Sequence, residues 1–485
     1  MFSLLIKRCF AVIILFSAAS VLHAQKNLPE DYLSKEFHAG RRDAARAIMP
    51  DSSAMIIFAA PVRNFSNDVD YLYHQNPDLY YFTGYKEPNS ILILFKNEQT
   101  SSDGSKYNEV FFVQPKDSFA EQWNGRRLGT DGVKEKLGVK NVFTGNAFKN
   151  FYLDISSISK IIMPVIPEDV RDQRDSIDLY DLLSQLRNKT GINTTSKNEK
   201  WDFRLFREIT GKLREIKTPE ELVLLRKAVE ISCIGQNEVM KTVHPGMSEM
   251  EIQGLHEFVH KKYGAENVGY GSIIGSGENG CILHYMENTK TKVGNEMLLM
   301  DVGAEYHGYT ADVTRTIPVD GKFSAEERTI YQLVYDAQEA AFKILKDGAK
   351  WSDASAAATE VIANGLMKLG IIKDKAEVKK YYPHGLGHHI GLDVHDRSFS
   401  QTLKKGMVIS IEPGIYIPPD SPVDKKWWGI AVRIEDNVLL REKDYELLSK
   451  FAPRSIDEIE KMIAEKSVLD NFKLPPLQSA PKKAF

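Results

Sequence analysis

The sequence contains little cysteine, with three such residues in a chain of 485. Cys9 lies in an N-terminal segment that we expect to be removed, which leaves Cys233 and Cys281. Two cysteines are too few for the disulfide framework that holds small secreted domains together. We therefore expect both to be buried thiols, with a single bridge between them left open.

An excess of charge of one sign is also absent, because the formal net charge is -3. Nucleic-acid binding needs a basic surface excess, so we expect no nucleic-acid partner. Hydrophobic residues make up 42% and charged residues 27% of the chain, which is typical of a soluble globular protein. The length exceeds what one ordinary core accommodates and no tandem repeat is visible, so we expect two different domains.

A long apolar run occurs at the N-terminus. Lys7 and Arg8 precede apolar residues from Phe10 to Leu22, and small or polar residues follow around Ala24. The run is too short to span a bilayer, and a positive start followed by such a run is typical of a secretory signal peptide. We expect residues 1–24 to be this signal and the mature chain to be exported, periplasmic or secreted, without a membrane span.

Residues 30–200 predict a smaller α/β domain, because short β-rich runs alternate with turns and helical segments. The runs are Ala54–Ala60, Ile91–Phe95 and Val110–Val113, and the clearest helix is Ser176–Arg187. We interpret the polar stretch Lys96–Asn108 as a loop and Asn188–Lys200 as the connector to a second domain.

Residues 210–460 predict a second domain of α+β class, because helices and strands come in blocks. Capping-box spacing opens helices at Thr218, Ser248 and Ser324, and Ser352 opens a fourth helix that ends at Gly370. The β-patterned runs are Met297–Val302, Thr310–Val319, Met407–Glu412 and Ile430–Leu440. Residues 466–485 lose this periodicity and predict a flexible tail.

The strands of this second domain carry acidic residues in apolar, β-branched surroundings, where an unpaired carboxylate costs several kcal/mol. These residues are Asp301, Asp312, Glu412 and Glu435. The period of two places Asp312 on one strand face with Thr310, Thr314 and Thr316. Each acid alone fits a turn or a salt bridge, but together they indicate a common counter-charge.

The glycine-rich stretch His384–His389 adds imidazoles to these carboxylates. Four carboxylates and one imidazole suit two divalent ions, with manganese favoured and cobalt or zinc as alternatives. Two such ions about 3.5–4 Å apart share bridging carboxylates and a bridging hydroxide, which is the nucleophile that hydrolysis at neutral pH requires.

From about Lys217 to Ala452 the sequence resembles the metal-dependent aminopeptidase P and prolidase family, whose catalytic domain has the pita-bread (creatinase/aminopeptidase) fold. The matching stretches are Gly275–Gly280 with His284-Tyr285, Asp301–Gly303, Asp312–Arg315, His384–His388, Asp393–Asp396, Ile411–Gly414 and Arg433–Asp436. All five metal-ligand positions carry the expected residue type.

The resemblance implies a role for each of these residues. Asp312 and Glu435 would bridge the metals, Asp301 would complete one coordination sphere, and His388 and Glu412 would complete the other. Glu412 would also be the general base. His284 would lie toward the leaving nitrogen and His395 toward the scissile carbonyl oxygen, with His384, Tyr416 and Arg433 shaping the pocket. His389 is interpreted as structural.

In the first domain, Asn76–Tyr85 with Glu87-Pro88, followed by Trp123–Gly129, resembles the N-terminal domain of aminopeptidase P. This resemblance implies an enzyme that cleaves peptides with proline at the second position, after the first residue. A prolidase acting on Xaa-Pro dipeptides is the alternative, and a metal-free binding module is a distant one. Methionine aminopeptidase is disfavoured because it lacks this first domain. Whether the chain forms a homo-oligomer stays open.

Two further motifs imitate other functions. His256–His260 matches the zinc-protease pattern of two histidines one turn apart, but no clear third ligand accompanies it, so we expect an amphipathic helix whose histidines face solvent or a neighbour. Gly275–Gly280 satisfies the dinucleotide fingerprint, but Cys281–Tyr285 after it predicts a strand where that fold needs a helix.

Overall fold

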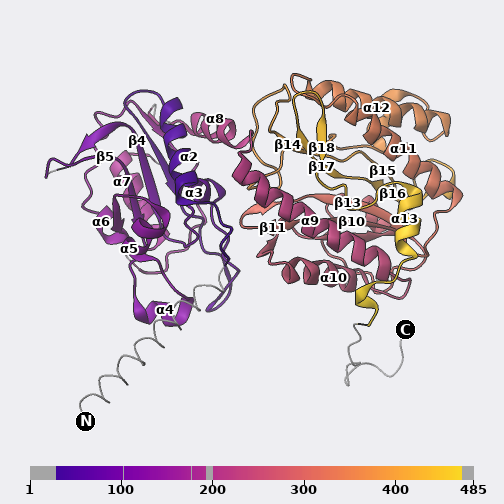
Figure 1. The fold of residues 1–485 in the computed structure, drawn as a ribbon, viewed down its shortest axis with the longest axis horizontal. Helices are drawn as coiled ribbons and strands as arrows, with labels where there is room; N and C mark the ends of the chain where they lie inside the picture. The colour runs from indigo at the N-terminus through magenta and orange to yellow at the C-terminus, as the bar shows by residue number, and fades with distance from the viewer. Residues whose placement is uncertain (1–28, 102, 176, 193–199, 472–485) are drawn as a thin grey trace, which may run out of the picture.

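The computed structural model describes residues 29–101, 103–175, 177–192 and 200–471. Figure 1 shows two domains side by side, the first in indigo to violet and the second in magenta to yellow. The predicted signal peptide lies outside the described residues, as does most of the predicted tail. None of the helices in the described part of the chain combines the length and hydropathy that crossing a bilayer requires.

The first domain is built on a mixed sheet of five strands in the order β6-β5-β4-β1-β7. The strands are β1 (Ser53–Phe58), β4 (Ile91–Thr100), β5 (Lys106–Val113), β6 (Val142–Thr144) and β7 (Lys160–Ile162). Side chains of β1 point alternately to opposite faces, so Ile56 packs with α7 (Leu179–Thr190) and Ile57 with α2 (Lys35–Ile48) and α3 (Pro77–Thr83). Helices thus cover both faces, which confirms the predicted α/β architecture.

The predicted loop Lys96–Asn108 is wrong, because β4 and β5 continue into it as a hairpin that pairs as far as Thr100 and Lys106. The register shifts between Leu94 and Gln99, and much of the outer part is exposed. A hairpin that projects beyond the core has no apolar face, so the alternation that predicts a strand is missing. The helix predicted at Ser176–Arg187 is α7, and residues 193–199 of the predicted connector lie outside the described residues.

The second domain begins with two helices and places two more after its first strands. The helices are α9 (Pro219–Thr242), α10 (Glu249–Lys262), α11 (Ala325–Phe342), α12 (Trp351–Lys368) and, near the end, α13 (Ile456–Ile463). The predicted capping boxes at Thr218 and Ser324 are confirmed, and Ser248 caps α10. The helix predicted from Ser352 to Gly370 is confirmed as α12, which begins one residue earlier; the Ser352 hydroxyl bonds to Asp353 instead of capping the helix.

The strands of the second domain form short, interrupted sheets. They are β8 (Asn267–Val268), β9 (Ile273–Ser276), β10 (Met297–Val302), β11 (Ala304–Tyr306), β12 (Tyr309–Thr310), β13 (Val313–Pro318), β14 (Val408–Ile411), β15 (Gly414–Ile417), β16 (Ile430–Arg433), β17 (Asp436–Leu440) and β18 (Tyr445–Leu447). Helix α9 packs against β11, β12 and β13, and α11 packs against β15 and β16.

Two predicted strands, Thr310–Val319 and Ile430–Leu440, are each broken in the middle. The breaks fall at residues 311–312 and 434–435, so they contain Asp312 and Glu435. At the first break a side chain replaces the neighbouring strand: Asn437 accepts from the Asp312 N–H at 3.0 Å and donates to the Asp312 carbonyl at 2.5 Å. The apolar alternation continues across both breaks, which is why the sequence pattern predicted unbroken strands.

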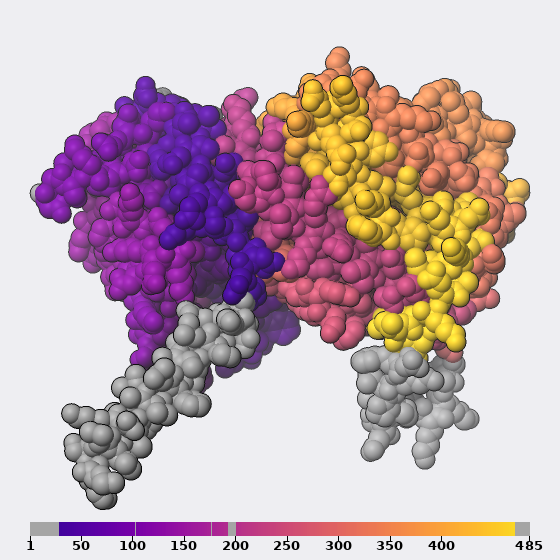
Figure 2. All heavy atoms as spheres, viewed as in Figure 1, coloured from indigo at the N-terminus to yellow at the C-terminus, as the bar shows by residue number. Residues whose placement is uncertain are grey.

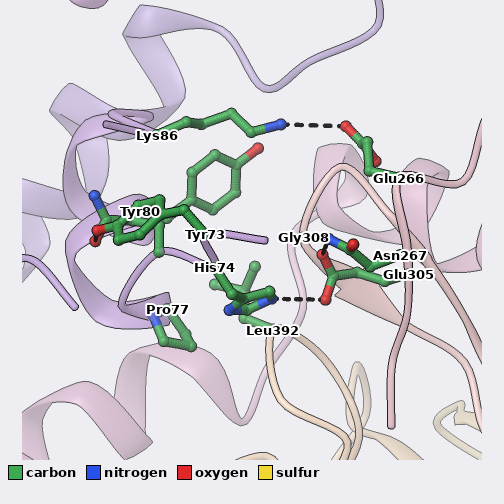
Figure 3. A pocket seen from close by; sticks show the side chains of 11 residues that line it. Tyr73, His74, Pro77, Tyr80, Lys86, Glu266, Asn267, Glu305, Gly308 and Leu392 are labelled. Atoms are coloured by element: carbon green, nitrogen blue, oxygen red, sulfur yellow. Dashed lines mark hydrogen bonds and ion pairs between the residues drawn. The ribbon is translucent and has the colours of Figure 1, made fainter. Parts of the chain in front are cut away.

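Two ion pairs join the domains across a small cavity (Figure 3). Lys86 Nζ lies 3.2 Å from Glu266 Oε1, and His74 Nε2 lies 2.7 Å from Glu305 Oε2. The hydrogen bond that His74 donates to Glu305 raises the pKa of His74, so this contact favours the protonated imidazole.

The first described residues form a second connection. Asp31 accepts hydrogen bonds from His307 Nε2 at 2.9 Å, Lys227 Nζ at 2.9 Å and the Tyr306 hydroxyl at 2.7 Å. The Tyr32 ring stacks on His307 with centroids 3.7 Å apart. In Figure 2 the two domains are lobes in contact, with indigo atoms against magenta ones.

Candidate active site

The interrupted sheets bring the four carboxylates together at one place. Asp301 lies in β10 opposite Thr314 of β13, and Glu412 directly follows β14. Asp312 and Glu435 lie in the two strand breaks, and the Glu435 N–H donates to the Thr314 carbonyl at 3.1 Å. The same sheets that bury the core therefore deliver all four acids to one cavity.

This cavity has a volume of about 450 Å³, within the range of sites for small ligands. All five predicted metal ligands line it, and so do His284, His384, His395 and Arg433. Apolar side chains of Ile273, Leu283, Met286 and Val394 complete the wall. Tyr416 is not part of the cavity wall, but its hydroxyl is hydrogen-bonded to both His384 and Arg433.

His388 presents one nitrogen to the carboxylates. Its Nδ1 lies 3.1 Å from the His389 carbonyl, which can only accept, so the proton sits on Nδ1. Nε2 then faces Asp312 Oδ2 at 3.3 Å and Glu412 Oε1 at 3.4 Å. This orientation is the one in which an imidazole binds a metal with its second nitrogen held by the backbone.

The carboxylates carry more negative charge than their cationic neighbours balance. Burial raises the pKa of Glu435 well above its usual range, and Asp312 and Glu412 raise it further. Burial also raises the pKa of Glu412 to about 7, although His388 opposes the shift. Burial lowers the pKa of His388, yet Asp312 and Glu412 more than offset this and raise it to about 9.

Arg433 is the main cation built into this cluster. Burial would raise the pKa of Asp301, but Arg433 Nη2 lies 2.6 Å from its carboxylate and holds the pKa below the usual range. Arg433 Nη1 donates to the Tyr416 hydroxyl at 2.9 Å. That hydroxyl lies 2.8 Å from His384 Nε2, and His384 Nδ1 faces the Gly385 carbonyl, so Tyr416 donates to an unprotonated Nε2.

The donor set fits divalent metal. The ligand atoms of Asp312, His388 and Glu435 lie within 4.8 Å of one another. Glu435 Oε2 accepts from Thr314 at 2.7 Å, whereas its buried Oε1 has no hydrogen-bond partner among the described residues. A buried, unpartnered carboxylate oxygen beside three further acids is satisfied by a cation and is costly without one.

Residues that the sequence did not single out also contact the acids. The Tyr270 hydroxyl lies 2.5 Å from Asp301 Oδ1 and also within hydrogen-bond distance of Asp312. Tyr270 stands between Gly269 and Gly271, and no motif or periodicity marks it. Asn437 bonds to the main chain of Asp312, and the Thr314 hydroxyl donates to the Glu435 side chain. Of these supporting residues only Thr314 has a signal in the sequence, because the strand period places it on the same face as Asp312.

The two imitating motifs have structural roles. His256 and His260 are buried on α10 beside Gly235 of α9, so they pack on a neighbouring helix. The glycine-rich stretch leads into a 3-10 turn, Gly277–Cys281, which agrees with the absence of a dinucleotide helix. The predicted strand Cys281–Tyr285 is wrong, since Cys281 ends that turn and residues 282–285 follow it outside any strand, which places His284 at the cavity. Cys233 and Cys281 are both free, and Cys281 is only half-buried.

Comparison with known proteins identifies both domains. Residues 223–442 match the model of metallopeptidase family M24, and residues 38–162 match that of the aminopeptidase P N-terminal domain. The Xaa-Pro aminopeptidase of Escherichia coli is 35% identical over 445 residues, covering 89% of this chain and 98% of that protein. Xaa-Pro aminopeptidase 3 of Dictyostelium discoideum is 30% identical, covering 89% of this chain and 83% of that protein.

Solved structures agree with this. Aminopeptidase P from E. coli with the inhibitor Pro-Leu has a TM-score of 0.77 at 34% identity, covering 89% of this chain and 98% of that one. Aminopeptidase PepP of Pseudomonas aeruginosa has a TM-score of 0.78 at 32% identity, with the same coverage. The second domain thus has the pita-bread fold, and the chain belongs to metallopeptidase family M24, in the aminopeptidase P group of that family.

Proposed function

We propose that this protein is an exported two-metal aminopeptidase that hydrolyses the bond between an N-terminal residue and a penultimate proline. Relatives of similar length are Xaa-Pro aminopeptidases, and both domains match that group. One observation carries the two-metal mechanism: Asp301, Asp312, His388, Glu412 and Glu435 all line one cavity, although they come from distant segments.

In this proposal the five residues would hold the two ions: Asp312 and Glu435 would be shared between them, Asp301 would serve one ion, and His388 with Glu412 would serve the other. A carboxylate-dominated set favours manganese, with cobalt or zinc as alternatives. When bound, the ions supply Lewis acidity that lowers the pKa of a water and polarises the substrate carbonyl.

The chain's own groups move the protons. Glu412 accepts a proton from the attacking water and passes it to the leaving proline nitrogen, which is general acid–base catalysis by one carboxylate. In this proposal His284 would lie toward that nitrogen and His395 toward the carbonyl oxygen; both residues line the cavity. His384, Arg433 and Tyr416 are tied together by hydrogen bonds and shape the wall that receives the substrate.

Removal of metal should abolish activity on a tripeptide of the form Xaa-Pro-Xaa, because no other group in the cavity replaces the Lewis acid. The measurement compares this tripeptide with an Xaa-Pro dipeptide and an Xaa-Ala-Xaa control, before chelation, after it, and after adding back Mn²⁺, Co²⁺ or Zn²⁺. We expect tripeptide cleavage that returns with metal. Exclusive dipeptide cleavage would instead indicate a prolidase, and full activity after chelation would refute the metal mechanism.

Export rests on the sequence of residues 1–24 alone. We expect mature protein isolated from its natural cell to begin after about Ala24, because Lys7, Arg8 and the apolar run up to Leu22 have the order of a signal peptide. N-terminal sequencing and cell fractionation measure this together. A chain that keeps Met1 and stays in the cytoplasm would contradict export without affecting the enzymatic proposal.

A further inference from the structure

Two fully buried glutamines lie behind the carboxylates on different helices. Gln236 belongs to α9 and Gln338 to α11, and both have 0% exposure. Neither lines the cavity or contacts a predicted metal ligand through its side chain. A polar amide in such a position needs a structural or functional reason, because burying it without partners costs stability.

The first glutamine is bonded to the main chain beside Asp301 and Asp312. Gln236 Nε2 donates to the Met300 carbonyl at 3.0 Å and to the Val313 carbonyl at 2.8 Å. Met300 directly precedes Asp301, and Val313 directly follows Asp312. Since both partners are acceptors, the amide nitrogen must face them, and this fixes the orientation of the side chain.

The second glutamine is bonded to the main chain beside Glu412 and Glu435. Gln338 Nε2 lies 2.9 Å from the Ile411 carbonyl and 3.1 Å from the Ile434 carbonyl, and it also lies 3.0 Å from the buried Asp436 carboxylate. Ile411 and Ile434 directly precede Glu412 and Glu435. The Gln338 carbonyl oxygen accepts from Arg454 at 3.2 Å, so the orientation of this amide is also fixed.

Three of these four carbonyls lie where strands begin, end or break, and the fourth, that of Met300, lies inside β10. Strand β13 begins at Val313, β14 ends at Ile411, and residues 434–435 separate β16 from β17. A strand end leaves carbonyls without a ladder partner, and a buried carbonyl needs one. Each amide bonds to two chain segments at once, and so couples the main-chain positions of two acids.

We infer that Gln236 and Gln338 are positioning residues, each setting the spacing of one carboxylate pair and thereby chiefly the affinity for one of the two metal ions. Gln236 holds Asp301 and Asp312, and Gln338 holds Glu412 and Glu435. This inference rests on the proposed two-metal site, in which Asp301 belongs to one ion and Glu412 to the other, while Asp312 and Glu435 are shared. The larger loss of affinity therefore falls on a different ion in each variant.

The test uses Gln236→Met and Gln338→Met, which keep the side-chain volume but remove the amide. Gln75→Met is the matched control: Gln75 is also buried and donates to the Glu87 carbonyl at 2.8 Å, but it lies in the first domain. The full-length proteins are stripped of metal and titrated with Mn²⁺ by calorimetry. We expect one of the two ions to bind about 10–100-fold more weakly in each test variant, and neither ion to change in the control.

Electron paramagnetic resonance with one Mn²⁺ per chain then distinguishes the two sites. In Gln338→Met the remaining ion should lack the nitrogen coupling of His388, whereas in Gln236→Met it should keep that coupling. If the methionine variants do not fold, Gln236→Asn and Gln338→Asn keep an amide that is too short to reach both carbonyls, and the same losses are expected. Activity should return at high Mn²⁺ concentration.

Two results would count against the inference in different ways. A wild-type chain that binds fewer than two ions would overturn the two-metal function, and the inference with it. A wild-type chain that binds two ions, with test variants that match Gln75→Met in affinity and spectrum, would overturn only the positioning role.

Discussion

Replacing Glu412 with glutamine should lower kcat on an Xaa-Pro-Xaa peptide by about 10²–10⁴-fold, the usual contribution of a general acid–base group. The amide keeps the shape of the side chain but cannot take a proton from water or give one to the leaving nitrogen. The measurement is kcat at a Mn²⁺ concentration that saturates the variant, with metal content checked, because Glu412 is also a predicted ligand.

Glu278→Gln is the control for this substitution, since Glu278 is exposed and does not line the cavity. We expect its kcat to equal that of the wild type. If a fully metal-loaded Glu412→Gln retained more than about a tenth of wild-type kcat, the acid–base role would belong to another group, because the loss would lie below the usual range.

Replacing Arg214 with methionine should lower the free energy of unfolding by about 3 kcal/mol, because it removes the buried cation that Asp78 and Asp396 share. The Arg214 side chain is 1% exposed and lies 2.8 Å from Asp78, 2.7 Å from Asp393 and 2.5 Å from Asp396. Lys217 still pairs with Asp396 at 2.9 Å and Arg397 still pairs with Asp78 at 2.7 Å, so the loss should lie at the lower end of the range for broken buried pairs.

Urea unfolding at pH 7 measures this change, with Arg204→Met as the control. The Arg204 side chain is 83% exposed and pairs only with Glu208 among the described residues, so its loss should be below about 0.5 kcal/mol. Burial would raise the pKa of Asp396, but Arg214 and Lys217 more than offset this and lower it. Its contribution is therefore complete above the unfolded pKa of about 4 and is lost as the pH falls further. Equal losses in the two variants would contradict the role of Arg214.

Arg214 also links the domain interface to catalysis. Asp78 belongs to the first domain, whereas Asp393 and Asp396 flank His395, which lines the cavity. Arg214→Met should therefore reduce activity even in the folded state, because the segment that carries His395 loses its anchor.

The acids of the site could be predicted because charged residues are rarely found in buried, apolar strands without a partner. Asp301 and Glu412 interrupt apolar strands, and an uncompensated carboxylate there is costly enough to indicate a cation without any knowledge of the fold. Which acids share one cavity could not be derived in this way. It depends on the strand breaks at Asp312 and Glu435, and alternation of apolar residues continues across both.

The residues that hold these acids in place could not be predicted from the sequence, for a different reason. Gln236 and Gln338 lie in helices, where a single polar residue is ordinary, and only the packing of α9 and α11 shows that both amides face main-chain carbonyls. Tyr270 and Asn437 act through contacts with residues far away in the sequence. Sequence patterns report periodicity within one element, so bonds between elements have no pattern of their own.

The bond between Asp31 and His307 joins residues 276 positions apart. Closing so long a loop costs chain entropy before the contact contributes anything, and contacts of this kind form slowly. His307 has a φ of 50° between β11 and β12, so its ring is in place only after that hairpin has formed. The earliest described part of the chain must therefore wait for the second domain to fold, and docking of the two domains is expected to be the last and slowest step of folding.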